Sequence, residues 1–527
     1  TIANGGKVLV DGAAKDFLLG FNAGADGNRV TVRGAGSELS NLNGTLYVGR
    51  SSMSNSLHIE SGGLVTSKNV RIGGGTGSAG TNASGNVVYV DGAGSVWNIS
   101  GTLRVGSGTA TTSDGNVVEI TGGGVVNVAG NSFLGYDANS DGNRVLVSGT
   151  GSHLNAHALT IGNVDGATGN VVTLANGGLL TATSITLRES SGLVIGAGGA
   201  AGSITAPVII TGAGTAPCYV TFDHTDTAYT FGSTLAGNLA VNHDGSGTTR
   251  LTGANTYAGA TTINAGRLDI DGSVTGPVLV NAGGTLGGIG SFGGGTVNAG
   301  GVIAPGNSIG TLASTSGLQF ATGSAFVVDV NASGQFDRLV VTGAAGLAGE
   351  VRVQAAPGAY APGTTNPILT ATSLGGTFSG VTTSSPFYTS SLTYDATNVY
   401  LTIQGIGAPV MASVQANGNV PGLGAARLFD SLIAGTPGAG MSPIVASLFA
   451  LPNQQAVSGA VSQTLPLLNG GVTPATQGTL AGIDNVIQTR LDANRGLASG
   501  DFFPGDRNVW LKPFGSWADQ GDRNGVS

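Results

Sequence analysis

Short runs in which β-branched residues alternate with polar ones recur along the first half of the chain. Typical examples are Val30 to Val32, Val88 to Val90 and Val145 to Val147. An alternation with a period of two predicts β-strands that bury one face. Glycine, asparagine and aspartate cluster after each run, and these residues supply the positive-φ positions that tight turns need. The pattern therefore predicts short strands joined by tight turns.

These runs belong to a repeat that starts each time at an asparagine. Successive starts lie 27, 31, 30, 27 and 27 residues apart, at Asn28, Asn55, Asn86, Asn116, Asn143 and Asn170. Three short strands in a repeat of this length predict one coil of a solenoid whose coils contact mainly their neighbours. A β-propeller would need four strands in about 40–50 residues. We predict an all-β fold, a right-handed parallel β-helix with a C-terminal cap, followed by a partly helical linker.

Composition narrows the possible classes of protein. The chain has 95 glycines in 527 residues but only 17 prolines and no three-residue period, which excludes collagen. Its 20 basic residues are scattered along a sequence of net charge −8, so we expect no basic face and no nucleic-acid partner. The single cysteine, Cys218, excludes an internal disulfide framework and a cysteine-based zinc cluster. The chain begins at Thr1 without a signal segment and is expected to be a processed or excised fragment.

From Leu251 to Leu312 the repeat changes in character. This stretch contains Gly266-Arg267-Leu268, then a glycine-rich segment from Gly283 to Gly290, then APGNSIGTL from Ala304. In this order the segments resemble the passenger-associated transport repeat of bacterial autotransporters. The resemblance marks a set of residues as its structural motif: Gly283, Gly284, Leu286, Pro305, Gly306, Asn307, Ser308 and Gly310.

The resemblance divides the chain into six regions. They are tandem 27–31-residue coils (1–190), continuing coils (191–250), the transport repeat (251–315), a cap or autochaperone-like region (316–405), a linker with a helix near 480–495 (406–507), and the start of an outer-membrane β-barrel (508–527). A cap is also expected on physical grounds, because the end of a β-helix exposes unpaired strand edges. A barrel needs at least eight strands, so we expect the rest of the translocator to be missing from this chain. The helix near 480–495 would either run through the barrel pore or pack as a linker helix.

As a function, the resemblance implies a non-enzymatic passenger that acts as an adhesin or surface-structure module. It would be displayed at the outer membrane of a Gram-negative bacterium or be released, and its C-terminal region would drive folding and translocation. The implied partners are its own barrel, the barrel-assembly machinery and a ligand on a host cell or matrix. Two alternatives remain open. One is a β-helical enzyme that degrades polysaccharide, and the other is a protease passenger.

Several motifs are candidates for chemistry. Gly306 to Gly310 fits the nucleophile pattern G-x-S-x-G, but no histidine follows Ser308 in the chain. His153 and His157 would lie roughly 13 Å apart along a strand, too far for one metal ion, and are expected at exposed polar positions. Gly196 to Gly202 comes close to G-x-G-x-x-G, with its last glycine one residue late, and no strand–helix unit surrounds it.

Two groups of acidic residues are further candidates for a catalytic or metal site. Asp223, His224, Asp226, His243 and Asp244 lie near Ser246 in the sequence, and we predict a solvated loop there. Three aspartates precede Gly-Asn at coil boundaries, namely Asp26, Asp114 and Asp141. Asx-type turns account for these aspartates without calcium. We therefore predict no catalytic, cofactor or metal site.

Overall fold

The computed structural model describes residues 1–10, 12, 15–74, 82–108, 112–205, 209–356, 360, 365–435, 440–465 and 480–489. The chain divides into two compact units. The first comprises Thr1–Pro409 and Pro437–Pro452, and the second comprises Val410–Thr436 and Asn453–Ser527.

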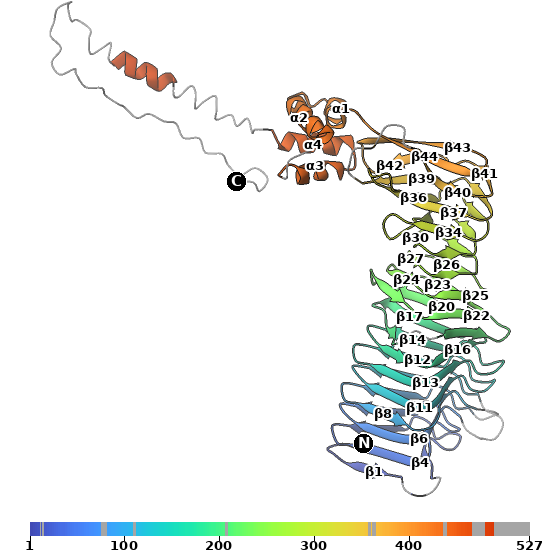
Figure 1. Ribbon diagram of the computed structural model, residues 1–527. Helices are drawn as coiled ribbons and strands as arrows, with labels where there is room; N and C mark the ends of the chain where they lie inside the picture. Colours follow the sequence, from blue (N-terminus) through green and yellow to red (C-terminus); the bar gives the residue numbers. More distant parts are fainter. Residues whose placement is uncertain are drawn as a thin grey trace, which may run out of the picture. The chain divides into compact units, whose positions relative to one another are not determined.

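The first unit is a parallel β-helix, as predicted, and its strands stack in columns (Figure 1). One side is a sheet of 15 strands in chain order. These strands are β3 (Arg29–Arg33), β5 (Ser56–Glu60), β7 (Val87–Asp91), β10 (Val117–Thr121), β12 (Arg144–Ser148), β14 (Val171–Ala175), β17 (Gly192–Gly199), β20 (Cys218–His224), β23 (Leu239–His243), β26 (Thr261–Ile263), β29 (Val278–Val280), β32 (Gly295–Val297), β35 (Leu318–Phe320), β38 (Ala344–Leu347) and β41 (Ser373–Gly376).

A second sheet of 21 strands forms the opposing side of the coils. Its members are β1 (Lys7–Leu9), β2 (Phe17–Leu19), β4 (Glu38–Val48), β6 (Leu64–Ile72), β8 (Val96–Ile99), β9 (Leu103–Val105), β11 (Val125–Leu134), β13 (His153–Ile161), β15 (Leu179–Thr181), β16 (Ser184–Arg188), β18 (Ser203–Ile204), β19 (Ile209–Ala213), β22 (Thr234–Gly237), β25 (Ala254–Tyr257), β28 (Ser273–Val274), β31 (Ser291–Phe292), β34 (Thr311–Ser314), β37 (Arg338–Val341), β40 (Thr365–Thr370), β43 (Tyr388–Tyr394) and β44 (Asn398–Gly405). The predicted second and third strands of a coil are continuous in β4, β6, β11 and β13, and separate in β8 and β9.

A third sheet of eight strands begins only at Tyr229. It contains β21 (Tyr229–Phe231), β24 (Thr248–Leu251), β27 (Gly266–Ile270), β30 (Gly284–Gly287), β33 (Val302–Ile303), β36 (Ala325–Val330), β39 (Glu350–Ala355) and β42 (Val381–Thr383). Coils also become shorter here, because Thr261, Val278 and Gly295 are register partners only 17 residues apart.

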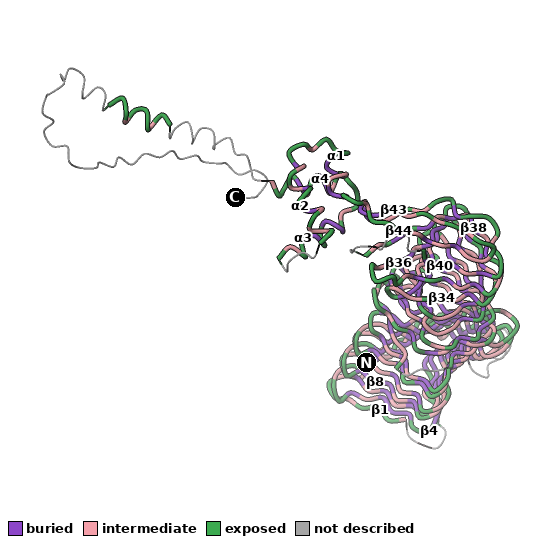
Figure 2. Tube along the Cα trace, turned by 45° about the horizontal axis from the view of Figure 1, so that its top comes forward, coloured by how far each residue is buried: buried purple, intermediate pink, exposed green. Residues whose placement is uncertain are grey.

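Parallel register places equivalent residues in stacks inside the β-helix. One stack on the 15-stranded sheet runs through Val32, Ile59, Val90, Ile120, Val147, Leu174, Ile195, Phe222, His243, Ile263, Val280, Val297 and Phe320. All of these side chains are buried, and buried positions alternate with outward ones along the strands (Figure 2). Such a stack removes apolar surface from water at every coil.

The asparagine that starts each repeat is also buried, and it connects neighbouring coils. Asn55, Asn86, Asn116, Asn143 and Asn170 have no exposed surface. The Oδ1 atom of Asn86 accepts hydrogen bonds from the backbone N and the Nδ2 of Asn55, at 2.9 and 3.1 Å. The same pair of bonds repeats up to Asn170. Together these residues form a ladder, the asparagine ladder, which satisfies polar groups that burial would otherwise leave unpaired.

The glycine that ends each repeat makes room for this ladder. Gly49 has a φ of +71°, and a Cβ added there would lie 2.2 Å from Oδ1 of Asn86. A side chain at this position would therefore collide with the ladder and strain the backbone.

Aromatic side chains gather at the C-terminal end of the β-helix. The rings of Phe320 and Phe378 lie 5.2 Å apart, and Phe326 contacts both. Strands β43 and β44 add to β40 in antiparallel fashion. Helix α3 (Ser442–Phe449) brings Phe449 to 4.8 Å from the ring of Phe387. This helix comes from the segment expected to be part of the linker.

The second unit is helical in its described part. It contains most of α1 (Pro409–Ala416), then the 3₁₀ turn η1 (Val420–Gly422), α2 (Leu423–Ala434) and α4 (Gln454–Gln463). These helices lie in the segment predicted to be a partly helical linker, but their positions were not predicted. The two carboxylate oxygens of Asp430 accept the backbone N–H groups of Val410 and Met411, both at 2.9 Å. Carboxylates are favoured at this end of a helix.

The predicted helix near 480–495 is present over residues 480–489. Residues 490–495, and the predicted barrel strand at 508–527, lie outside the described residues. No described helix is both long and apolar enough to cross a bilayer.

Candidate functional site

The transport-repeat motif builds a charged surface cavity of about 410 Å³. Its first part shapes the coil that supports the cavity. Leu286 is fully buried and pairs in register with Leu268 and Ile303 of the neighbouring coils. Gly283 has a φ of +87°, and a Cβ on Gly284 would lie 2.4 Å from the carbonyl oxygen of Ile263. These glycines let the chain turn tightly against the previous coil.

The second part of the motif, Pro305 to Gly310, is a loop held by Arg267. Nη2 of Arg267 donates to the carbonyl oxygens of Ala304 and Gly306, at 3.2 and 2.7 Å. Its Nε donates to Oδ1 of Asp269 at 2.7 Å, and the Asp269 side chain is only 4% exposed. The guanidinium therefore joins a buried carboxylate to the loop across 37–39 residues of sequence.

Asp271 holds the same loop from the outer side. Its carboxylate accepts from Nδ2 of Asn307, with distances of 3.3 and 3.4 Å to the two oxygens. The same carboxylate forms a 3.1 Å ion pair with Arg250. Asn307 is thus held by a residue two coils earlier, because β33 pairs with β30 and β30 with β27, while Ser308 is exposed.

Asp337 holds the end of the loop from the coil above. Its Oδ1 accepts from the backbone N of Gly310 at 2.7 Å and its Oδ2 from the backbone N of Asp329 at 2.8 Å. Burial raises the pKa of Asp337 to about 7, although these two bonds oppose the shift. Burial also raises the pKa values of Asp269 and Asp329. The cavity therefore has carboxyl groups that gain protons more readily than ordinary aspartates do.

The arrangement around this cavity is suited to tying coils together. The loop residues could be predicted from the sequence, but the side chains that hold the loop were not predicted, namely Arg267, Asp269, Asp271 and Asp337. Arg267 lies within the Gly266-Arg267-Leu268 segment, and Asp269 follows it two residues later. An arginine and an aspartate at this spacing on one strand could have indicated an ion pair.

The predicted solvated loop around His224 and His243 is wrong. Both imidazoles are fully buried, and so is Thr249 between them. Thr249 Oγ1 lies 2.8 Å from Nε2 of His224 and 3.1 Å from Nε2 of His243. His243 occupies an otherwise apolar stack between Phe222 and Ile263, and sequence proximity to aspartates concealed this inward position.

The backbone contact of His243 fixes the direction of the hydrogen bonds between the two histidines and Thr249. Nδ1 of His243 lies 2.8 Å from the carbonyl oxygen of Ala265, so Nδ1 carries a proton and Nε2 accepts from the Thr249 hydroxyl. His224 must then donate through Nε2 to Thr249. Burial lowers the pKa values of both histidines.

The other candidate residues are dispersed. Ser246 is exposed. His153 is half-buried with its Nε2 2.9 Å from Thr181 Oγ1, while His157 on the same strand is exposed. Among the described residues, no group of three or more His, Cys, Asp or Glu side chains is placed to hold a metal ion.

The boundary aspartates bind across coils, so the prediction of local Asx turns is wrong in its geometry. Oδ1 of Asp26 accepts from the backbone N of Met53 at 2.7 Å. Oδ1 of Asp114 accepts from the backbone N of Asp141 at 2.8 Å, and Asp141 repeats the contact with Thr168. The partners are 27 residues away because one coil separates them.

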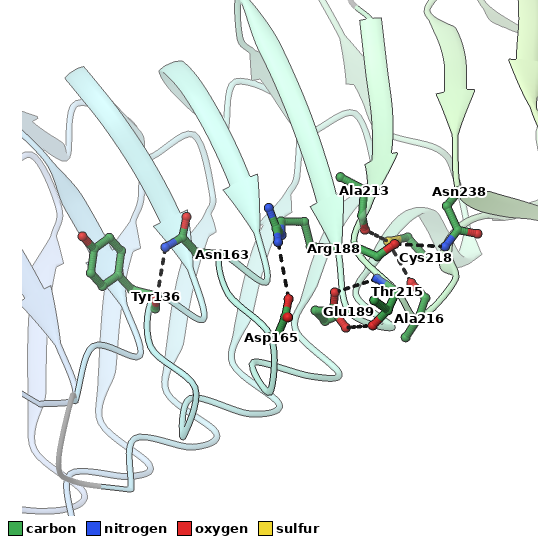
Figure 3. Close-up of polar contacts among 11 residues, drawn as sticks. Tyr136, Asn163, Asp165, Arg188, Glu189, Ala213, Thr215, Ala216, Cys218 and Asn238 are labelled. Carbon is green, nitrogen blue, oxygen red and sulfur yellow. Dashed lines mark hydrogen bonds and ion pairs between the residues drawn. The ribbon is translucent and has the colours of Figure 1, made fainter.

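Cys218 lies in the interior. Its Sγ is 3.6 Å from the carbonyl oxygen of Ala213 and 3.9 Å from that of Ala216 (Figure 3). Burial raises the pKa of the thiol, and the side chain is only 1% exposed as part of the core, which makes it a poor nucleophile.

Comparison with known proteins gives three findings. The passenger-associated-transport-repeat family matches residues 244–270. The chain is 34% identical over 338 residues to the Adhesin BmaC autotransporter of Brucella suis biovar 1 (strain 1330), a match that covers 56% of this chain and 9% of that protein. It is 37% identical over 119 residues to an extracellular serine protease of Serratia marcescens, which covers 23% of this chain and 11% of that protein. The chain thus spans about a tenth of the length of each of these relatives.

Proposed function

Because this chain is a stretch of autotransporter passenger domain that carries a passenger-associated transport repeat, we propose that it acts as a non-enzymatic adhesin or surface-structure module. The relatives indicate a cell-surface or secreted protein of a Gram-negative bacterium. Attachment to the outer membrane through its own barrel, assembled by the barrel-assembly machinery, is part of the proposal. So is a ligand on a host cell or matrix.

The observation that carries this proposal is how the polar side chains are used. His224, His243 and Thr249 hydrogen-bond to one another in the core, and Arg267 and Asp337 hold the loop that contains Ser308. These groups connect coils. The long outward faces of the β-helix are left for contact with other molecules, as suits an adhesin.

A direct experiment measures attachment. Bacteria that display this chain on their surface should bind cultured cells or matrix-coated wells more strongly than bacteria without it. Equal attachment by both would overturn the proposal. The protease alternative has its own test, because hydrolysis of casein that is lost in Ser308→Ala or Ser246→Ala would establish an enzyme instead. Cleavage of a polyuronate by the purified chain would do the same for the polysaccharide-degrading alternative.

The proposal includes a role for the C-terminal coils in translocation. Stacking of these coils outside the membrane would draw the rest of the chain through the pore. The contact of Phe320, Phe326 and Phe378 supports this role, because it gives these coils a large apolar core. Phe326→Ala should lower surface display, measured by accessibility to external protease, more than Leu57→Ala does. Equal loss in both variants would contradict a C-terminal nucleus.

A further inference from the structure

Three arginines that are far apart in the sequence lie together on the outside of the β-helix. Tyr47, Arg71, Arg104 and Phe133 are successive register partners on β4, β6, β9 and β11. Arg50 lies two residues after the end of β4, over the rings of Phe21 and Tyr47, at 4.7 and 5.6 Å. We call these residues, with Tyr136, the arginine strip. Register partners on adjacent strands are about 4.8 Å apart.

The strip contradicts the expectation that the chain has no basic face. Arg71 and Arg104 are 33 residues apart in sequence, about the length of one coil, so the solenoid places them side by side. Scattered basic residues can therefore form one surface when their spacing equals the repeat. The amino-acid composition alone does not reveal this arrangement.

Aromatic rings hold the guanidinium groups in position. The Cζ atom of Arg104 lies 3.7 Å from the ring centre of Tyr136 and 6.0 Å from that of Phe133. Arg71 lies 5.9 Å from the ring of Tyr47. Stacking of this kind leaves the edge of a guanidinium free to donate, and it reduces the rotamer entropy lost when a ligand binds.

Arg71 and Arg104 carry positive charge that no adjacent carboxylate among the described residues neutralises. In the part of the chain that the structure describes, no carboxylate oxygen lies within 4 Å of Arg71 or Arg104. Asp137 is near enough for both arginines to lower its pKa, although burial raises that pKa more. By contrast, Arg188 on a later coil has its own partner, Asp165, at 3.5 Å (Figure 3).

A groove lined by both polar and apolar residues crosses the same strands. Its cavity of about 320 Å³ is lined by Thr66, Asn98, Asn127 and Asn155 together with residues of the bend beside them. These four are also register partners on successive coils. Nδ2 of Asn127 donates to Oδ1 of Asn98 at 2.9 Å, and the remaining amide donors and acceptors suit hydroxyl groups.

Groove and strip lie on the same strands, on either side of the bend that separates β8 from β9. Thr66 and Arg71 lie on β6, and Asn127 and Phe133 lie on β11. Five or six residues of strand span roughly 16–20 Å. A linear ligand that follows the strands around this bend would meet amides first and guanidinium groups next.

We propose that this surface, which follows the bend, binds a linear anionic polysaccharide, with its hydroxyl groups in the asparagine-lined groove and its carboxylate or sulfate groups on Arg71 and Arg104. Guanidinium groups pair with such anions through two parallel hydrogen bonds. The inference deepens the proposed adhesin role and rests on it for its biological meaning, but the binding itself is tested separately.

The test uses the whole 527-residue chain and immobilised glycans. Heparin offers sulfates, hyaluronan offers carboxylates, and dextran has neither. We expect binding to at least one anionic glycan, weakening as salt rises, and none to dextran. The double variant Arg71→Gln/Arg104→Gln should bind at least tenfold more weakly. The control Arg29→Gln/Arg33→Gln removes the same charge from β3 in the other sheet and should stay within twofold of wild type.

Specific outcomes would overturn the inference. They are binding to neither heparin nor hyaluronan, equal loss in the control, or equal affinity for single-stranded DNA of the same charge, which would indicate a non-specific polyanion surface. If the double variant does not fold, Arg104→Lys keeps the charge and removes the paired hydrogen bonds, and it should still weaken binding severalfold. Cell attachment that persists in the double variant would refute the glycan as the ligand for adhesion and leave the adhesin role standing. Glycan binding without cell attachment would refute the adhesin role and leave the glycan inference standing.

Discussion

Asn86 and Asn116 lie one coil apart, and the single Oδ1 atom of Asn116 accepts both the backbone N–H and the side-chain Nδ2–H of Asn86, at 2.9 and 3.1 Å. Both residues are fully buried. Each asparagine of the ladder thus accepts hydrogen bonds from a backbone donor and a side-chain donor of the coil before it. A buried donor left unpaired costs about 1–3 kcal/mol, so the ladder contributes to stability mainly by avoiding that penalty.

The first prediction concerns this rung. Asn116→Ala should lower the free energy of unfolding by about 1–3 kcal/mol, because the buried backbone N–H of Asn86 loses its acceptor, whereas Nδ2 of Asn86 keeps the carbonyl oxygens of Ala83 and Ser52. Urea denaturation followed by circular dichroism measures the change. Asn163→Ala is the matched control, since Asn163 is half-buried and its Nδ2 makes one 3.1 Å bond to the carbonyl of Tyr136 (Figure 3). The control should lose less than about 1 kcal/mol. Similar losses in both variants would show that the ladder has no special role.

The second prediction concerns the loop of the transport repeat. Arg267→Gln should destabilise the protein by about 2–4 kcal/mol, because it leaves the buried carboxylate of Asp269 without its cation and frees two carbonyl groups of the loop. Limited proteolysis should then cut between Pro305 and Gly310 more rapidly than in wild type.

A double-mutant cycle separates the two causes. Arg267→Gln/Asp269→Asn should be more stable than Arg267→Gln alone, since the unpaired buried charge is gone. Strictly additive effects would mean that the 2.7 Å contact between these residues contributes nothing beyond their separate roles.

The third prediction is a pH dependence. The pKa of Asp337 is about 7 in the folded protein and 3.8 as a reference. The folded state therefore holds an additional proton between about pH 4 and 7, so the stabilisation from this group is complete below pH 4 and is lost as pH rises to 7. Asp337→Asn should remove this slope. The two histidines have lowered pKa values and act in the opposite direction below pH 6.5.

The measurement is the difference in unfolding free energy between wild type and Asp337→Asn from pH 4 to 8. Taking the difference cancels the histidine contribution, which both proteins share. The wild type should lose about 2–4 kcal/mol relative to the variant across this range. A flat difference would contradict the shifted pKa.

The fourth prediction concerns the buried hydroxyl of Thr249. Thr249→Val has nearly the same shape but leaves Nε2 of both His224 and His243 without a partner. It should cost about 2–3 kcal/mol in thermal or chemical unfolding. The control Thr262→Val replaces a half-buried threonine on the next coil and should stay within about 0.5 kcal/mol of wild type. A neutral effect of Thr249→Val would mean that water supplies the missing hydrogen bonds.

The period of the asparagines was enough to predict a parallel β-helix, because a 27–31-residue repeat with period-two alternation has few other solutions. The chemistry between coils was harder to predict. His243 looks polar in the sequence but occupies an apolar stack, and Arg267 acts on carbonyl groups nearly 40 residues away. Such contacts depend on which residues share a register position, and alternation along one strand does not give that information.

The helices of the linker were also hard to predict from the sequence. Residues 431–483 carry no charge, so helices there could not be recognised from charged faces or acidic first turns. Phe449 of α3 contacts Phe387 on the β-helix, a tertiary contact without any local sequence pattern.

The asparagine ladder has a consequence for how such a protein can change in length. Every rung joins one asparagine to another, so each coil offers its neighbours the same partner. Removal of residues 86–115 would bring Asn116 to the place of Asn86, where it would meet the same donors on Asn55. In-frame gain or loss of a whole coil in the gene therefore conserves the interior hydrogen bonds, and recombination between neighbouring repeats can vary the length of the protein without redesigning its core.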